Sequence, residues 1–167
     1  MIGTMVVLGV DPGTARTGYA IVKKEKGENQ LLCFGVISTE KSLNSELRLL
    51  EVFNRLSKLI RKWQVTELAL ESLFFNANAK TAMLVSQASG VVKLLAARSR
   101  VPLFEYTPLQ VKIALTGYGR AEKSQVGKMV QRIFNLEAVP SPDDAADAVA
   151  IALCHCYSRK LKVSFKK

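Results

Sequence analysis

The sequence predicts a mixed α/β fold in which helices pack on a single β-sheet. Three apolar runs rich in β-branched residues lie within the first 38 residues, and short turns separate them, as in an antiparallel meander. From residue 45 onward the apolar residues recur at helical spacing, and two shorter strand-like runs interrupt the helices. The chain has 167 residues, 49% of them hydrophobic, which is enough for one domain with a substantial core.

The three N-terminal strands are expected at residues 5–11, 17–22 and 30–38. The first is a continuous apolar run that ends on Asp11 and is followed at once by a Pro-Gly turn. Strands that are covered on both faces are continuously apolar, so this run is expected to lie inside the sheet. Residues 23–29 are charged and contain a glycine, which predicts the turn between the second and third strands.

Helices alternate with strands in the rest of the chain. Apolar residues recur every three or four positions over 45–63 with basic residues between them, which predicts an amphipathic helix on the sheet. Thr107 and Pro108 form a typical helix start, with an N-cap followed by proline at the first helical position. The remaining elements are expected as a strand at 66–71, a helix at 79–98, a strand at 101–106, and helices at 108–115, 122–134 and 141–157.

The predicted helix at 79–98 is apolar around much of its circumference, which indicates burial on two sides. Either it is central within one subunit or it forms a subunit interface, and we favour the interface of a dimer. Residues 1–158 are expected to form a single domain. Residues 159–167 carry five basic residues and no acid, and they are expected to form a flexible tail.

The net charge indicates a polyanionic partner. Lys and Arg total 24 against 14 acidic residues, which gives a formal charge of +10 and a pI near 9.7. Nucleic acid is the expected partner of so basic a domain, and a basic protein that binds no polyanion is the alternative. Three cysteines form no disulfide framework, so a reducing, cytoplasmic setting is expected. The sequence predicts no membrane span and no signal peptide.

Four acidic residues are candidate metal ligands. Asp11 and Glu71 each end an apolar strand, so they lie at one edge of the sheet if those strands are neighbours. Asp144 and Asp147 are three residues apart and project from one face of the last predicted helix. A favourable charge at the helix start is the alternative for Asp143 and partly for Asp144. It does not explain Asp147, which lies among alanine, valine and isoleucine, where an unpaired charge is costly.

Oxygen ligands without histidine or cysteine favour a hard cation such as Mg²⁺ or Mn²⁺. In a basic protein the expected task of such a site is phosphodiester cleavage, in which two ions activate water and stabilise the leaving oxygen. Cys154, His155 and Cys156 do not suit zinc, because adjacent positions on a helix do not converge on one ion.

Basic and aromatic residues near the acids are candidate DNA contacts. Lys123 opens a predicted helix, where a cation is mildly unfavourable, so a functional reason is more plausible there than for Lys128. Phe74 follows Glu71 closely and could stack on an unpaired base, although a core aromatic is equally consistent with the pattern. The basic residues of this part of the chain are Arg98, Arg100, Lys112, Arg120, Lys123, Lys128 and Arg132, against Glu105 and Glu122.

The motifs that surround these candidates resemble those of the RuvC-type crossover junction endodeoxyribonucleases, in order and over nearly the whole chain. Each motif alone is weakly specific, whereas the set is highly specific. In chain order they are Val7-Leu8-Gly9-Val10-Asp11-Pro12-Gly13 with Thr17-Gly18-Tyr19, Leu70-Glu71 followed by Phe74, Phe104-Glu105-Tyr106, Gln110-Val111-Lys112, Ala121-Glu122-Lys123-Ser124-Gln125-Val126, and Asp144-Ala145-Ala146-Asp147-Ala148.

The resemblance implies an RNase H-like fold with a mixed five-stranded sheet and helices on both faces. It implies a homodimer that makes paired nicks in four-way (Holliday) DNA junctions during recombination and repair, in association with a branch-migration motor complex. It also implies two Mg²⁺ ions per subunit, for which Mn²⁺ can substitute. In some members a histidine stands at the position of Asp144.

The resemblance also assigns roles to single residues. The implied metal ligands are Asp11, Glu71, Asp144 and Asp147, and Lys123 is the further catalytic residue. Lys112 and Lys123 match lysines that contact the region of the scissile phosphate, and Phe74 matches an aromatic that stacks on a junction base. The full set of expected DNA contacts is Phe74, Lys112, Arg120, Lys123 and Lys128.

Two other functions use the same features. A strand that ends in Asp-x-Gly-Thr also resembles the phosphate loop of actin-like ATPases, but those need two domains, for which 167 residues is too short. A DNA-binding module of the same fold without catalytic activity is the second alternative. The intact set of four acids argues against that module.

Overall fold

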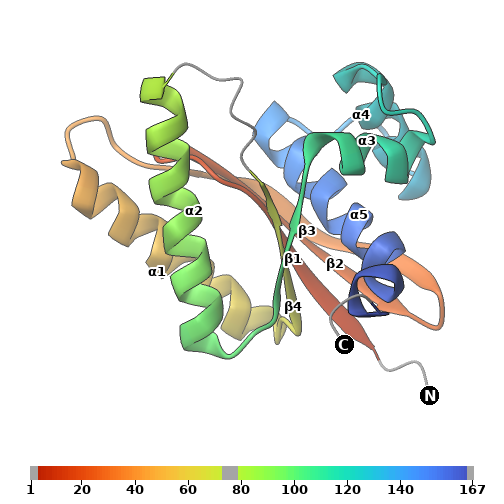
Figure 1. The fold of residues 1–167 in the computed structure, drawn as a ribbon, viewed down its shortest axis with the longest axis horizontal. Helices are drawn as coiled ribbons and strands as arrows, with labels where there is room; N and C mark the ends of the chain where they lie inside the picture. Colours follow the sequence, from red (N-terminus) through yellow and green to blue (C-terminus); the bar gives the residue numbers. More distant parts are fainter. Residues whose placement is uncertain (1–3, 73–78, 165–167) are drawn as a thin grey trace.

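The computed structural model describes residues 4–72 and 79–164. A five-stranded mixed sheet with the strand order β3-β2-β1-β4-β5 lies between two groups of helices (Figure 1). In this part of the chain, no helix has both the length and the apolar content needed to cross a membrane. The elements are β1 (Met5–Asp11), β2 (Arg16–Glu25), β3 (Glu28–Ser38), α1 (Ser45–Trp63), β4 (Glu67–Glu71), α2 (Ala79–Ser99), β5 (Leu103–Tyr106), α3 (Pro108–Thr116), α4 (Lys123–Ile133) and α5 (Asp143–Ser164).

The central strand β1 pairs with β2 in an antiparallel register and with β4 in a parallel register. Asp11 is opposite Gly18 of β2, and Val10 is opposite Leu70 of β4. The last residues of β1 and β4 therefore lie side by side at one end of the sheet. The condition under which Asp11 and Glu71 lie at one edge of the sheet, namely that strands 5–11 and 66–71 are neighbours, is therefore met.

Each face of the sheet carries its own hydrophobic core, because side chains alternate between the faces along a strand. Val7 of β1 and Ala69 of β4 pack with the apolar residues of α3, α4 and α5. Leu8 and Leu70 pack on the other face, with α1 and α2 (Figure 1). The expected fold, with helices on both faces of a mixed five-stranded sheet, is confirmed.

The β2–β3 hairpin is longer than expected. A two-residue turn at Lys26 and Gly27, with φ values of 50° and 95°, closes it directly after Glu25. Turns with two positive φ angles match the twist of paired strands, so the ladder continues to the turn. The charged residues from Lys23 onward therefore belong to the hairpin rather than to a loop.

The C-terminal helix is also longer than expected. It begins at Asp143, and the carbonyl of Pro142 accepts from the N–H of Ala146. It continues past the predicted end near Tyr157 to Ser164. Arg159, the first residue of the predicted tail, lies within this helix, and its side chain donates to the carboxylate of Glu67.

Candidate active site

Two neighbouring strands place Asp11 and Glu71 on the same face of the sheet. Asp11 is two residues beyond Gly9 of β1, and Glu71 is two residues beyond Ala69 of β4, which is opposite Gly9. Alternation along each strand directs both carboxylates toward α5. The backbone on which they are mounted is the rigid centre of the sheet, so their separation is fixed by strand pairing rather than by loops.

Glycines on two strands bring α5 against this end of the sheet. A Cβ atom at Gly9 would overlap the backbone carbonyl of Ala148, and one at Gly18 would overlap the carbonyl of Asp144. The helix backbone can lie this close because both strand positions lack a side chain. Asp144 and Asp147, one turn apart at the start of α5, are therefore held beside the end of β1 and the start of β2.

The four carboxylates lie close enough to act on one another electrostatically. Burial and the negative charges of Glu71, Asp147 and Asp144 raise the pKa of Asp11 to about 8. Burial and Asp147 also raise the pKa of Glu71, which shares a hydrogen bond with Asp11. The structure thus brings together the four acids that the sequence singled out. The positive charges nearby do not fully offset the negative charge of this group.

Lys123 and Arg16 contact two of the three carboxylates of α5. The Lys123 ammonium lies 2.6 Å from Oδ2 of Asp147, and Nη2 of Arg16 lies 2.6 Å from Oδ2 of Asp144. Partial burial opposes the charge of Lys123, but the hydrogen bond and the negative charge of Asp147 outweigh it and raise the pKa of the ammonium. Asp143 lies outside this group, with its side chain 89% exposed.

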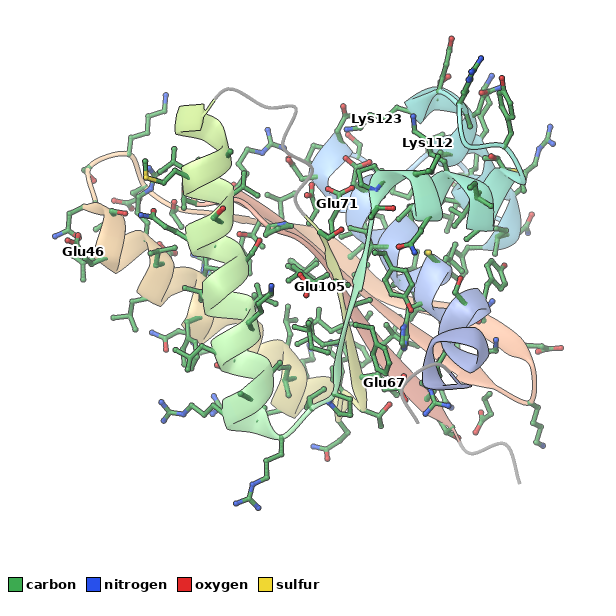
Figure 2. The ribbon with its side chains drawn as sticks, in the orientation of Figure 1. Glu46, Glu67, Glu71, Glu105, Lys112 and Lys123 are labelled. Atoms are coloured by element: carbon green, nitrogen blue, oxygen red, sulfur yellow. The ribbon has the colours of Figure 1, made fainter. Side chains whose placement is uncertain are left out.

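The predicted DNA contacts fall partly within the described residues. Lys112 of α3 and Lys123 lie at the same end of the molecule as Glu71 (Figure 2). Lys128 is exposed on α4, and with Lys123 it lines a groove that runs between α4 and the start of α5. Arg120 is exposed in the segment between α3 and α4. Phe74 lies outside the described residues.

The sequence reasoning missed Arg16. The order of the strands could have pointed to it. β2 runs antiparallel to β1 and begins close to Asp11, so the residues just before Gly18 lie near the end of β1.

A second cluster that the sequence did not reveal lies at the opposite end of β4 (Figure 2). His155, fully buried, has its Nε2 2.6 Å from Oε2 of Glu67 and its Nδ1 2.8 Å from the hydroxyl of Tyr106. Arg159 donates to both oxygens of Glu67. Burial opposes the charge of Glu67, but the hydrogen bonds from His155 and Arg159 outweigh it and lower its pKa to about 2.

The carboxylate cluster suits a divalent cation chemically. It offers only oxygen donors, the kind that Mg²⁺ and Mn²⁺ prefer, and its mutual repulsion shows in the raised pKa values of Asp11 and Glu71. In the side-chain positions of residues 4–72 and 79–164, no three acidic, histidine or cysteine groups converge closely enough to hold an ion without adjustment. Asp144 and Asp147 are directed instead toward their basic partners.

Comparisons with known proteins identify the family of this chain. The family model described as crossover junction endodeoxyribonuclease RuvC matches residues 7–155. A protein of that name from Ruminiclostridium cellulolyticum is 49% identical over 157 residues, covering 94% of this chain and 95% of the relative. One from Alkaliphilus metalliredigens is 48% identical over 162 residues, covering 97% and 99%. The solved structure of Thermus thermophilus RuvC in complex with Holliday junction substrate matches with a TM-score of 0.88 and 34% identity, covering 95% and 96%.

Proposed function

The chain belongs to the RuvC family of crossover junction endodeoxyribonucleases, and we propose that Asp11, Glu71, Asp144 and Asp147 form its catalytic metal centre. The protein is a metal-dependent nuclease that resolves four-way (Holliday) junctions in DNA recombination. The observation that supports the assignment is that four carboxylates, from two strands and one helix, lie at the same end of the sheet, near enough for Glu71, Asp147 and Asp144 to raise the pKa of Asp11.

We expect two Mg²⁺ ions per subunit, with Mn²⁺ able to substitute. When bound, such ions supply an activated water and charge stabilisation at the phosphate. Asp11 and Glu71 would hold them from the rigid side, because both belong to paired strands, whereas Asp144 and Asp147 would hold them from α5. Burial of Asp11 excludes water from one side of the centre, which strengthens the electrostatic interactions there.

The ammonium of Lys123 is the expected protein charge beside the scissile phosphate. Its 2.6 Å contact with Asp147 fixes it at the edge of the cluster, and its side chain is still 65% exposed. Lys112, Arg120 and Lys128 would contact neighbouring phosphates on the same side. Contacts to phosphate give affinity that falls with salt, as the charge of +10 leads one to expect. Phe74 keeps its predicted stacking role.

A homodimer would supply the two symmetric cuts. Met83 and Leu94 of α2 are each 62% exposed and lie on one stripe of the helix, eleven residues apart. Large exposed apolar side chains in such a stripe favour a helix-mediated contact between subunits. Leu94→Glu should shift the sedimentation coefficient toward a monomer.

A branch-migration motor complex and a cytoplasmic location remain predictions from the family resemblance.

Asp11→Asn tests the metal centre directly. It removes one ligand charge and keeps the shape, so Mg²⁺-dependent cleavage of a labelled four-way junction should fall by at least about 100-fold. Junction binding, measured by fluorescence anisotropy, should change little because Asp11 is a poor phosphate contact. Asp143→Asn is the matched control and should cleave normally, since Asp143 lies outside the cluster. Normal cleavage by Asp11→Asn would contradict the assignment.

A further inference from the structure

Arg16 is the first residue of β2, and its guanidinium reaches the carboxylate cluster from the sheet side. Nη2 lies 2.6 Å from Oδ2 of Asp144, with the two side chains 51% and 31% exposed. Lys123, at the start of α4, makes an equivalent contact with Asp147. Asp144 and Asp147 are therefore each engaged by one basic side chain of the protein itself.

The fold fixes the backbone position from which the Arg16 side chain extends. Thr17 Oγ1 donates to the Gly13 carbonyl at 2.6 Å, which closes the turn that carries Arg16. The N–H of Thr39 donates to the Ala15 carbonyl at 3.1 Å. Two residues farther along β2, Gly18 lies against the backbone of Asp144. The turn and the helix start are thus both fixed, and Arg16 lies beside Asp144 as a result.

A second layer of hydrogen bonds supports the same turn. Thr39 Oγ1 donates to the Thr14 carbonyl at 2.8 Å, and Arg48 Nε of α1 donates to Thr39 Oγ1 at 2.8 Å. The turn that carries Arg16 is therefore tied to both β3 and α1.

The contact has a consequence for cation binding. An incoming divalent cation must take the oxygen that Arg16 holds and must approach a fixed positive charge. Removal of a competing cation from a ligand strengthens the binding of the other cation by the free energy of the lost contact.

We propose that Arg16 is a positioning residue that competes with the divalent cation for Asp144 and so sets the metal affinity of the active site. It holds the Asp144 carboxylate in place beside β2 and yields it when metal binds. This inference rests on the proposed role of Asp144 as a metal ligand. It adds that the affinity of the site is limited by the protein's own arginine.

The test is Mn²⁺ binding to the full chain without DNA, with free Mn²⁺ measured by electron paramagnetic resonance. The variants are Arg16→Gln, which removes the charge, and Arg16→Lys, which retains it. Lys26→Gln is the matched control, because it changes the net charge equally beyond the far end of β2, away from the cluster. Circular dichroism and thermal unfolding check that each variant is folded.

Arg16→Gln should bind Mn²⁺ about three- to tenfold more tightly than the unmodified chain, the range expected for loss of a partly exposed ion pair. Arg16→Lys and Lys26→Gln should stay within about twofold of it. The Mg²⁺ concentration that half-saturates junction cleavage should fall for Arg16→Gln in the same ratio. A residue that only supported the structure of Asp144 would have the opposite effect, because its loss would weaken metal binding.

Two other outcomes separate this inference from the proposed function. If the unmodified chain binds Mn²⁺ and Arg16→Gln binds it equally or more weakly, the inference is overturned and the metal centre stands. If neither the unmodified chain nor Arg16→Gln binds Mn²⁺, the proposed metal centre is overturned, and the role of Arg16 is overturned with it.

Discussion

Lys123 is held beside the proposed metal ligands by charge, and this separates it from the other basic residues of α4. Its ammonium contacts Asp147 at 2.6 Å and is 3.9 Å from Asp143, and Asp147 and Asp143, with Asp11, raise its pKa. A lysine in such a field stays protonated and can stabilise charge that develops on a phosphate. Lys128, five residues farther along the helix, lies on the groove that leads away from the cluster.

Lys123→Ala should therefore reduce the single-turnover cleavage rate by roughly 100-fold, because it removes a charge close to the reacting phosphate. Junction affinity should fall only about threefold. Lys128→Ala, the comparison on the same helix, should weaken binding and leave the cleavage rate of bound junction nearly unchanged. Equal losses of affinity and rate in Lys123→Ala would show that it is a general phosphate contact.

The lowered pKa of Glu67, at the other end of β4, predicts that the stability of the protein depends on pH. Its pKa is lowered from 4.5 to about 2 by His155 and Arg159, which outweigh its burial. The stabilisation that this carboxylate provides is complete above pH 4.5 and is lost as the pH falls toward 2. Its side chain is only 8% exposed, so solvent screens these contacts little.

Glu67→Gln should lower the free energy of unfolding at neutral pH by on the order of 2–3 kcal/mol. The difference from the unmodified chain should shrink as the pH falls from 4.5 toward 2. Urea unfolding at a series of pH values measures both effects, with Glu28→Gln at the exposed start of β3 as control. A pH-independent difference would show that the ion pairs of Glu67 are not its source.

The sequence predicted the individual acids better than it predicted their neighbours. Asp11, Glu71 and Asp147 stood out because each is a charge at the end of, or within, an apolar pattern, where only a partner or a ligand makes it tolerable. Arg16 and Glu67 were missed, because a charged residue in a strand looks like an ordinary exposed charge until its partner is known. The partners, Asp144 for Arg16 and His155 for Glu67, are distant in sequence and both belong to α5.

At the scale of elements, α5 has the largest effect on the site. Its small residues Ala145, Ala148 and Ala152 are fully buried and let the helix lie directly on the sheet. The strand glycines Gly9 and Gly18 complete that close contact. The sequence contained these small residues, but it did not show which strand glycines would face which helix, since that depends on register. The elements themselves were predicted, with errors at their ends.

Gly18→Ala tests the close contact. The added methyl group would overlap the Asp144 carbonyl, which is backbone and cannot rotate away. Stability should fall by about 1–3 kcal/mol. Cleavage should fall strongly as well, because shifts near 1 Å at a catalytic group cost roughly 100-fold. Urea unfolding and single-turnover cleavage measure the two effects.

Gly35→Ala is the matched control on β3. Its new methyl group would meet the side-chain hydroxyl of Tyr19 at 2.8 Å, and a side chain can move. We expect a smaller loss of stability and normal cleavage. If Gly18→Ala behaves like Gly35→Ala, the packing of α5 on β2 does not position the carboxylates.

At the scale of the whole molecule, the two layers of helices have separate tasks. The layer of α3, α4 and α5 carries Lys112, Lys123 and the α5 carboxylates at the end of the sheet that holds Glu71 (Figure 2). The layer of α1 and α2 lies on the other face (Figure 1), and Met83 and Leu94 of α2 are exposed there. In the proposed function one face serves the chemistry, and the other is available for a second subunit. Charge and composition predicted a nucleic-acid partner, but not this division.

The most direct measurement is strand-resolved cleavage of a four-way junction and of a linear duplex of the same sequence, each with Mg²⁺ and with EDTA. A dimer with one metal centre per subunit predicts nicks at symmetric positions on two opposing strands of the junction, in Mg²⁺ only, with the duplex left intact. Comparable cutting of the duplex, unpaired nicks on single strands, or cutting in EDTA would contradict the account.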